Sequence, residues 1–157
     1  MNRHGPDIQL EIASNPNLLP AVRGMVSGLC ERFSFSEVEI GHICLALDEG
    51  LANVIRHGYE SQQDGRIWIA CTIIPESPIR LRIEIEDEGR QVDPSEIKSR
   101  DLSEVRPGGL GVHIMREVMD VCEFTTREES GMRLVLEKKA IDNATGITTA
   151  HSQQGYE

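Results

Sequence analysis

The chain has 157 residues, which suits one domain that buries a core without disulfides or metal ions. Its 26 acidic and 16 basic residues give a net charge of −10, which argues against nucleic acid as a partner because phosphate backbones attract basic surfaces. The cysteines at positions 30, 44, 71 and 122 form no metal-ligand motif, so buried free thiols in a reducing cytoplasm are expected. The N-terminus has no apolar signal core, and no stretch approaches the ~20 apolar residues of a membrane span.

The first 58 residues predict a strand followed by two helices. Residues 8–12 alternate between apolar and polar side chains, which is typical of a strand with one exposed face. Asn15-Pro16-Asn17 interrupts this pattern, and either asparagine could cap a helix over residues 18–32. Ser36 and Glu39 then have the spacing of a capping box, and apolar residues recur three or four positions apart as far as residue 55. This second helix is expected to end at Gly58.

The rest of the sequence predicts four strands and one further helix. Strands are expected over residues 66–74, 79–86, 121–127 and 132–138, and a helix over 110–119. The segment 87–111 is rich in charge, glycine and proline, which favours a lid or binding loop with a short helix after Pro94. Short connections favour antiparallel pairing, so we expect an α+β fold: a two-layer sandwich whose mostly antiparallel mixed sheet has helices on one face. The domain is expected to span residues 1–140, and residues 141–157 to form a flexible tail.

Glu49 and Asn53 lie four positions apart on the second predicted helix, so their side chains share one side of it. A carboxamide oxygen suits Mg²⁺, and a carboxylate could accept the proton of an attacking hydroxyl. The solvated face of an ordinary amphipathic helix could carry the same pair. Gly50 favours a site, because a glycine inside a helix costs about 1 kcal/mol relative to alanine and the close approach of another group would explain it.

Two further motifs would serve a nucleotide. The aspartate of Asp87-Glu88-Gly89 could accept a hydrogen bond from an exocyclic amine such as that of adenine, although an ordinary turn would use the same residues. The segment 106–113 (RPGGLGVH) leads into a predicted helix, where free N–H groups suit phosphate oxygens, with a flexible hinge as the alternative. It is not a Walker A loop, since no Lys-Ser/Thr follows. Taken in order, the motifs predict a nucleotide site.

Three strings resemble a known family. E-x-x-x-N at 49–53, D-x-G at 87–89 and G-G-L-G at 108–111 resemble the N, G1 and G2 boxes of the GHKL ATPase superfamily. Within it, ALDEGLANVIRHGYE and GGLGVHIMREVMD are similar to the anti-sigma factor serine/threonine kinases of bacteria. The resemblance covers residues 8–138. It implies a Bergerat-type ATP-binding fold, ATP and Mg²⁺ as cofactors, and a homodimer.

The resemblance also implies roles for residues at matching positions. Glu49 resembles the general base and Asn53 the Mg²⁺ ligand. Asp87 resembles the adenine acceptor, with Gly89 beside the base. The phosphate-binding backbone would then come from Gly108, Gly109, Leu110, Gly111 and Val112.

Two arginines and one departure complete the comparison with that family. Arg106, in the expected lid, would contact the γ-phosphate. Arg23, on the first predicted helix, lies where the family has a partner-contacting arginine. The G1 box of the wider superfamily reads D-x-G-x-G, and Gln91 stands here at the position of its second glycine. ATP binding is expected to survive this change, with a stiffer lid hinge.

The sequence thus predicts an ATP-dependent protein serine kinase and anti-sigma factor. Such a protein sequesters a sigma factor and phosphorylates an anti-anti-sigma partner, with Glu49 as the base and Mg²⁺ held by Asn53. A module that binds ATP without catalysis and switches between partners is the alternative. The catalytic half of a histidine kinase is disfavoured, because no helical hairpin with a phosphoacceptor histidine precedes the domain.

Overall fold

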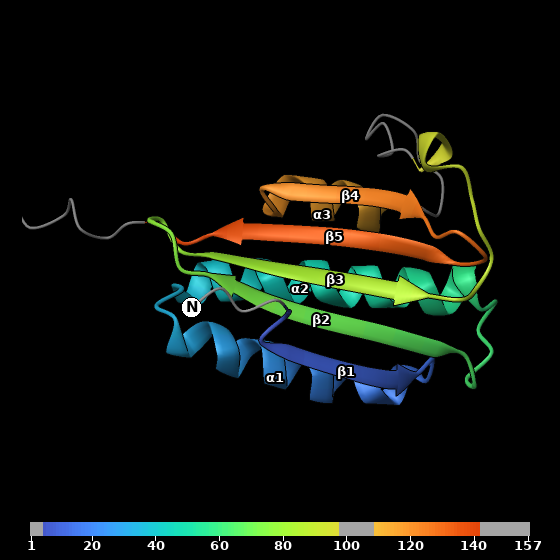
Figure 1. The fold of residues 1–157 in the computed structure, drawn as a ribbon, viewed down its shortest axis with the longest axis horizontal. Helices are drawn as coiled ribbons and strands as arrows, with labels where there is room; N and C mark the ends of the chain where they lie inside the picture. The colour runs from blue at the N-terminus through green and yellow to red at the C-terminus, as the bar shows by residue number, and fades with distance from the viewer. Residues whose placement is uncertain (1–4, 98–108, 142–157) are drawn as a thin grey trace, which may run out of the picture.

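The computed structural model describes residues 5–97 and 109–141. They form one five-stranded sheet in the order β1-β2-β3-β5-β4, with the α-helices packed together on one face (Figure 1). The strands are β1 (Ile8–Ala13), β2 (Arg66–Ile74), β3 (Arg80–Asp87), β4 (Val121–Thr126) and β5 (Met132–Lys139). The α-helices are α1 (Leu19–Arg32), α2 (Glu37–Asn53) and α3 (Leu110–Val118).

This arrangement confirms the predicted α+β class and the two-layer sandwich. Each of the four strand pairings between the described residues is antiparallel, so the sheet contains no parallel pair where a mixed sheet was expected. The short helix expected after Pro94 is the 3-10 turn η3 (Pro94–Glu96). The expected tail over 142–157 lies outside the described residues, so the domain limits stay a prediction.

α2 is the central helix of the domain. Ser36 caps it as predicted: its hydroxyl accepts the Glu39 N–H at 3.2 Å, and the Glu39 carboxylate accepts the Ser36 N–H at 2.7 Å. The other Glu39 oxygen accepts the N–H of Ile141 at 2.5 Å, so this buried carboxylate also holds the chain that leaves β5. One side chain therefore fixes the start of α2 and the end of the sheet relative to each other.

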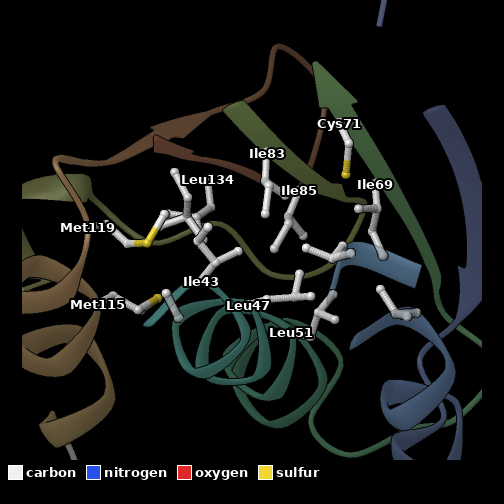
Figure 2. Packing of buried hydrophobic residues seen from close by; sticks show 14 of the residues in the cluster. Ile43, Leu47, Leu51, Ile69, Cys71, Ile83, Ile85, Met115, Met119 and Leu134 are labelled. Carbon is white, nitrogen blue, oxygen red and sulfur yellow. The ribbon is translucent and has the colours of Figure 1, made fainter. Parts of the chain in front are cut away.

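The core lies between α2 and the middle of the sheet. Side chains of α2 at Ile43, Leu47 and Leu51 point toward inward residues of the sheet such as Ile85 and Leu134 (Figure 2). All of them are at least 97% buried. Complete burial of each such side chain contributes roughly 1.5–3 kcal/mol, so this contact supplies much of the stability of the domain.

The opposite face of the sheet is charged. Alternate residues of β3 point away from the helices and pair with β5: Arg82 lies 3.3 Å from Glu137, and Glu84 is ion-paired with Arg133. Partly exposed pairs of this kind contribute little each, about 0–1 kcal/mol. The helical face therefore dominates the stability of the sheet.

Two expectations drawn from composition concern the cysteines and possible membrane spans. All four cysteines are free, with Cys30 and Cys71 buried and Cys44 and Cys122 half-buried. Burial raises the pKa of Cys30 and Cys71 to about 12 and that of Cys122 to about 11, so these thiols are protonated and poorly reactive. None of the helices within residues 5–97 and 109–141 has the length and apolar character needed to cross a membrane.

Gly50 lines a cavity at the end of α2, as expected for a site, and the sheet also approaches it closely. A Cβ atom at this position would lie 2.8 Å from Leu134 Cδ2 and 3.3 Å from Ile85 Cδ1. The group that approaches Gly50 closely is thus the sheet of the protein itself, and α2 can pack this near to β5 because position 50 carries no side chain.

We expect Gly50→Val to destabilise the domain by about 1–3 kcal/mol more than Gly41→Val, because only the first overfills the α2–sheet contact. Gly41 is the matched control: it is exposed in the same helix, and a Cβ there would meet nothing within 4 Å. Urea unfolding of both variants measures the difference between their free energies of unfolding. The low helix propensity of valine affects both variants equally and so cancels in this difference. Equal destabilisation would contradict the close packing at Gly50.

Candidate functional site

Three segments that are distant in the sequence meet at one end of the domain: the end of α2, the end of β3 and the start of α3 (Figure 1). They surround a cavity of about 500 Å³, a size typical of small-molecule sites. Predicted residues from all three motifs line it, namely Asn53, Asp87, Gly109, Gly111 and Val112. The cavity therefore brings together the residues that the sequence assigned to one ligand.

The end of α2 changes its helical winding at the cavity. After Asn53, residues Val54–Gly58 form a π-helical turn, η2, instead of the expected continuous α-helix. Turns of this type are rare and often occur at functional sites. Here the turn places Arg56, His57 and Gly58 on the cavity wall together with Asn53.

Glu49 and Asn53 do not share one environment, although they lie one helical turn apart. Asn53 lines the cavity, whereas Glu49 lies beside it against α3. A Cβ atom on Gly111 would lie 2.3 Å from Glu49 Oε2, so the glycine makes room for this carboxylate. Arg56 Nη2 lies 3.9 Å from the same oxygen. The Glu49 side chain is 29% exposed, which leaves the carboxylate accessible at the rim of the cavity.

Asp87 is buried at the base of the cavity and is 2% exposed. Its carboxylate accepts the N–H of Gly89 at 2.8 Å and a further backbone hydrogen bond from Met132. Burial raises the pKa of Asp87, while these hydrogen bonds and the charge of Arg127 act in the opposite direction. A buried acceptor that faces a cavity is suited to bind an amine of a ligand.

Gly89 is important for the packing of the loop rather than for the lining of the cavity. A Cβ atom there would lie 2.4 Å from the carbonyl oxygen of Gly58, and that oxygen accepts the Arg90 N–H at 2.8 Å. The two glycines thus let the chain after β3 contact the end of η2. In this structure Gly89 touches the protein backbone, whereas the family resemblance places it beside the nucleotide base.

The start of α3 forms the third side of the cavity. Gly109 adopts a left-handed conformation (φ 81°, ψ −8°) before the helix begins, which a glycine accommodates without strain. Gly109, Gly111 and Val112 line the cavity, but Leu110 does not line it and is 50% exposed. Free N–H groups of the first helical turn and the positive end of the helix dipole favour an anion here.

Three other predicted residues are not among the residues that line the cavity in the described part of the chain. Arg106 and Gly108 lie outside the described residues. Arg23 lies on α1, away from the cavity lining, where its guanidinium is ion-paired with Asp48 of α2. Its side chain is nonetheless 42% exposed.

The apolar floor of the cavity was not predicted from the sequence. Strands β3, β4 and β5 provide it, through the residues Ile85, Phe124, Met132 and Leu134. Their alternation in the sequence shows that such residues point inward, but it does not show which of them lie at the open end of the sandwich. Polar residues of the wall, such as Arg90 in the loop after β3 and Glu96 in the single turn η3, lie in segments too short to show a periodic pattern.

The cavity offers little protein ligation for a metal ion. No group of three or more histidine, cysteine or acidic side chains able to hold one occurs in the part of the chain that the structure describes. Mg²⁺ is often held by one or two protein oxygens together with phosphates and water, and this requirement matches the single carboxamide of Asn53. The residues present therefore fit an ion that arrives with a nucleotide.

Residues 12–138 match the family described as the histidine kinase-like ATPase domain. The chain belongs to this family, which confirms the predicted superfamily. It is similar to the serine-protein kinase RsbW of Bacillus subtilis (strain 168), with 25% identity over 94% of this chain and 96% of that protein. RsbW of Halalkalibacterium halodurans is also 25% identical, over 98% of this chain and 99% of that protein.

A solved structure shares the fold. The crystal structure of RsbU and RsbW domains from Mycobacterium tuberculosis superposes on 86% of this chain with a TM-score of 0.60 and 16% sequence identity. The match spans 33% of that longer chain. This likeness supports the α/β sandwich of the domain.

The buried carboxylate of Asp87 predicts a pH-dependent cost to the protein without ligand. Because its pKa is higher in the folded than in the unfolded state, the ionised form destabilises the fold, and this cost grows as pH rises through the interval between the two values. The free energy of unfolding of Asp87→Asn relative to wild type should thus rise as pH increases above the ordinary aspartate pKa of about 3.8. Urea unfolding at several pH values measures it, with the exposed Asp64→Asn as the control for loss of one charge. A flat difference would contradict the destabilising carboxylate.

Proposed function

We propose that this chain is an ATP-dependent protein serine kinase and anti-sigma factor, which sequesters a sigma factor and phosphorylates an anti-anti-sigma partner. The observation that carries the proposal is the convergence of Asn53, Asp87 and the start of α3 on one cavity, with Glu49 at its rim. The full-length similarity to proteins named serine-protein kinase RsbW supports the same activity.

The cavity assigns one part of ATP to each of its sides. Asp87 accepts a hydrogen bond from the exocyclic amine of adenine, and the apolar floor, which includes Phe124 and Met132, packs against the base. The first turn of α3 binds phosphate oxygens through its N–H groups. Asn53 lines the same cavity and would hold Mg²⁺, which neutralises phosphate charge when bound.

Glu49 accepts the proton of the partner's serine hydroxyl. The serine oxygen forms a bond to the γ-phosphorus as the bond from that phosphorus to the β–γ bridging oxygen breaks, so phosphoserine and ADP result. Arg56, 3.9 Å from Glu49, helps to orient the carboxylate toward the cavity that Arg56 itself lines. Gly111 leaves the space in which the carboxylate stands.

The partner contacts extend the proposal beyond the cavity. Arg23, exposed on α1 and anchored by Asp48, would contact a protein partner, and Arg106 would contact the γ-phosphate. We also propose a homodimer that works in the cytoplasm without binding nucleic acid directly. The net charge of −10 supports the last point, because such a chain repels nucleic-acid phosphates.

One observation supports the alternative of a partner-switching module that binds ATP without catalysis. Glu49 lies outside the cavity lining and within ion-pair distance of Arg56, so its carboxylate is partly engaged. In this alternative ATP acts only as a conformational ligand, and Glu49 has a structural role.

Glu49→Gln separates the two candidates. If Glu49 is the base, phosphate transfer from labelled ATP to an anti-anti-sigma protein should fall roughly 10²–10⁴-fold, because the amide cannot take the proton. ATP affinity, measured by calorimetry, should change little, since the cavity lining stays intact. Glu37→Gln, in the exposed first turn of the same helix, is the control and should retain transfer.

The two negative outcomes of this experiment lead to different conclusions. ATP binding by the wild type with no transfer to any candidate partner would support the non-catalytic module. Absence of ATP binding by the wild type would contradict both candidates.

A further inference from the structure

The hairpin between β4 and β5 contacts the main chain of Asp87 directly. Arg127 Nη1 donates a hydrogen bond to the Asp87 carbonyl oxygen at 2.6 Å. Gly131, with φ +79°, lies against the same group: a Cβ atom there would be 1.8 Å from this oxygen. Since a side chain at 131 would collide with backbone, the glycine is required for the hairpin to reach Asp87. The main chain of Asp87 is therefore held by the hairpin between β4 and β5.

Arg127 is itself held in place by several groups. Its guanidinium lies 5.2 Å from the ring centroid of Trp68, and its Nε lies 3.5 Å from Glu86. Its own carbonyl oxygen accepts a hydrogen bond from Gln91 Nε2 at 2.7 Å. Stacking on an aromatic ring while donating a hydrogen bond is a geometry that suits arginine better than lysine. These contacts together fix the position of the Arg127 side chain.

We propose that Arg127 is a positioning residue for Asp87 and that, through it, Arg127 sets the preference of the cavity for adenine over guanine. This inference rests on the proposed function, because it takes Asp87 as the acceptor for the adenine amine. The carboxylate of Asp87 is fixed by the Gly89 and Met132 N–H groups, and Arg127 holds the same residue through its main-chain carbonyl oxygen.

Arg127 also affects the charge state of Asp87. Burial raises the pKa of the carboxylate and the Arg127 charge lowers it, so removal of that charge should raise it further. The other ionisable groups around it are Tyr59, Glu86 and Glu88, which interact with it electrostatically or adjoin it, and the cavity-lining Arg56, His57, Glu60, Arg90 and Glu96. Glu86 loses its contact with Arg127 in the variant but keeps the one with Arg133, 3.5 Å away. These groups stay unchanged in an Arg127 variant, so a change in pH dependence can be assigned to position 127.

The test measures ATP and GTP affinity of the full chain by calorimetry over a range of pH values. Arg127→Ala should weaken ATP binding roughly tenfold and leave weak GTP binding unchanged, so that selectivity falls. The pH at which ATP binding weakens on acidification should move upward, because a protonated Asp87 has lost its negative charge and one acceptor oxygen and binds the amine hydrogen less strongly. Arg127→Lys should restore part of the selectivity. Arg80→Ala, at the other end of β3, is the matched control and should behave as wild type.

The outcomes separate the inference from the function on which it rests. If Asp87→Ala abolishes ATP binding while Arg127→Ala keeps the wild-type selectivity and pH profile, the role of Arg127 is overturned and the proposed function stands. If the wild type binds no ATP, both are overturned. Circular dichroism verifies the folding of each variant. If Arg127→Ala does not fold, the Arg127→Lys variant is used instead. Wild-type selectivity and pH profile in Arg127→Lys would then overturn the role of Arg127, and reduced selectivity would support it.

Discussion

α2 packs directly on the centre of the sheet, and both the core and the cavity depend on how closely it approaches. Ile43, Leu47 and Leu51 fix the rotation of the helix, since their burial favours one face toward the sheet. Gly50 fixes the depth, because it lets the helix reach β5. With rotation and depth set, the last α-helical residue, Asn53, must face the open end of the sandwich, where the π-helical turn η2 follows. The same packing thus stabilises the domain and orients the carboxamide.

The cavity is assembled from close backbone contacts at glycines. Gly89 packs on Gly58, Gly131 packs on the carbonyl of Asp87, and Gly111 packs on the Glu49 carboxylate. Each contact fixes the position of one group, but the glycine that makes it contributes no side chain that could have been buried. The buried Asp87 carboxylate adds a further cost, because desolvation disfavours its charge. Stability is therefore lower at this end of the molecule, where ligand binding can compensate for it.

The sequence predicted the elements well because local patterns determine them. The capping box at Ser36 and the strands over residues 66–74 and 132–138 occur where they were expected, within one residue at each end. The motif residues were found because each has an unusual type in its context, such as an aspartate followed by a glycine at the end of an alternating strand. The apolar floor, the π-helical turn after Asn53 and the contact between Arg127 and Asp87 were missed. These features arise from tertiary contacts between distant segments, which a linear pattern does not encode.

The tie between Glu39 and Ile141 has a practical consequence for work with this protein. It places the last described residue beside the first turn of α2, whereas the cavity is lined by Gly50 and Asn53 in the last turn. The two ends of α2 lie at opposite ends of the domain (Figure 1). A helix rises about 1.5 Å per residue, so these two places are roughly 20 Å apart. A fluorophore or surface linker attached near residue 141 would therefore start at the end of the domain remote from the nucleotide. Such a label can report on partner docking without occupying the mouth of the cavity.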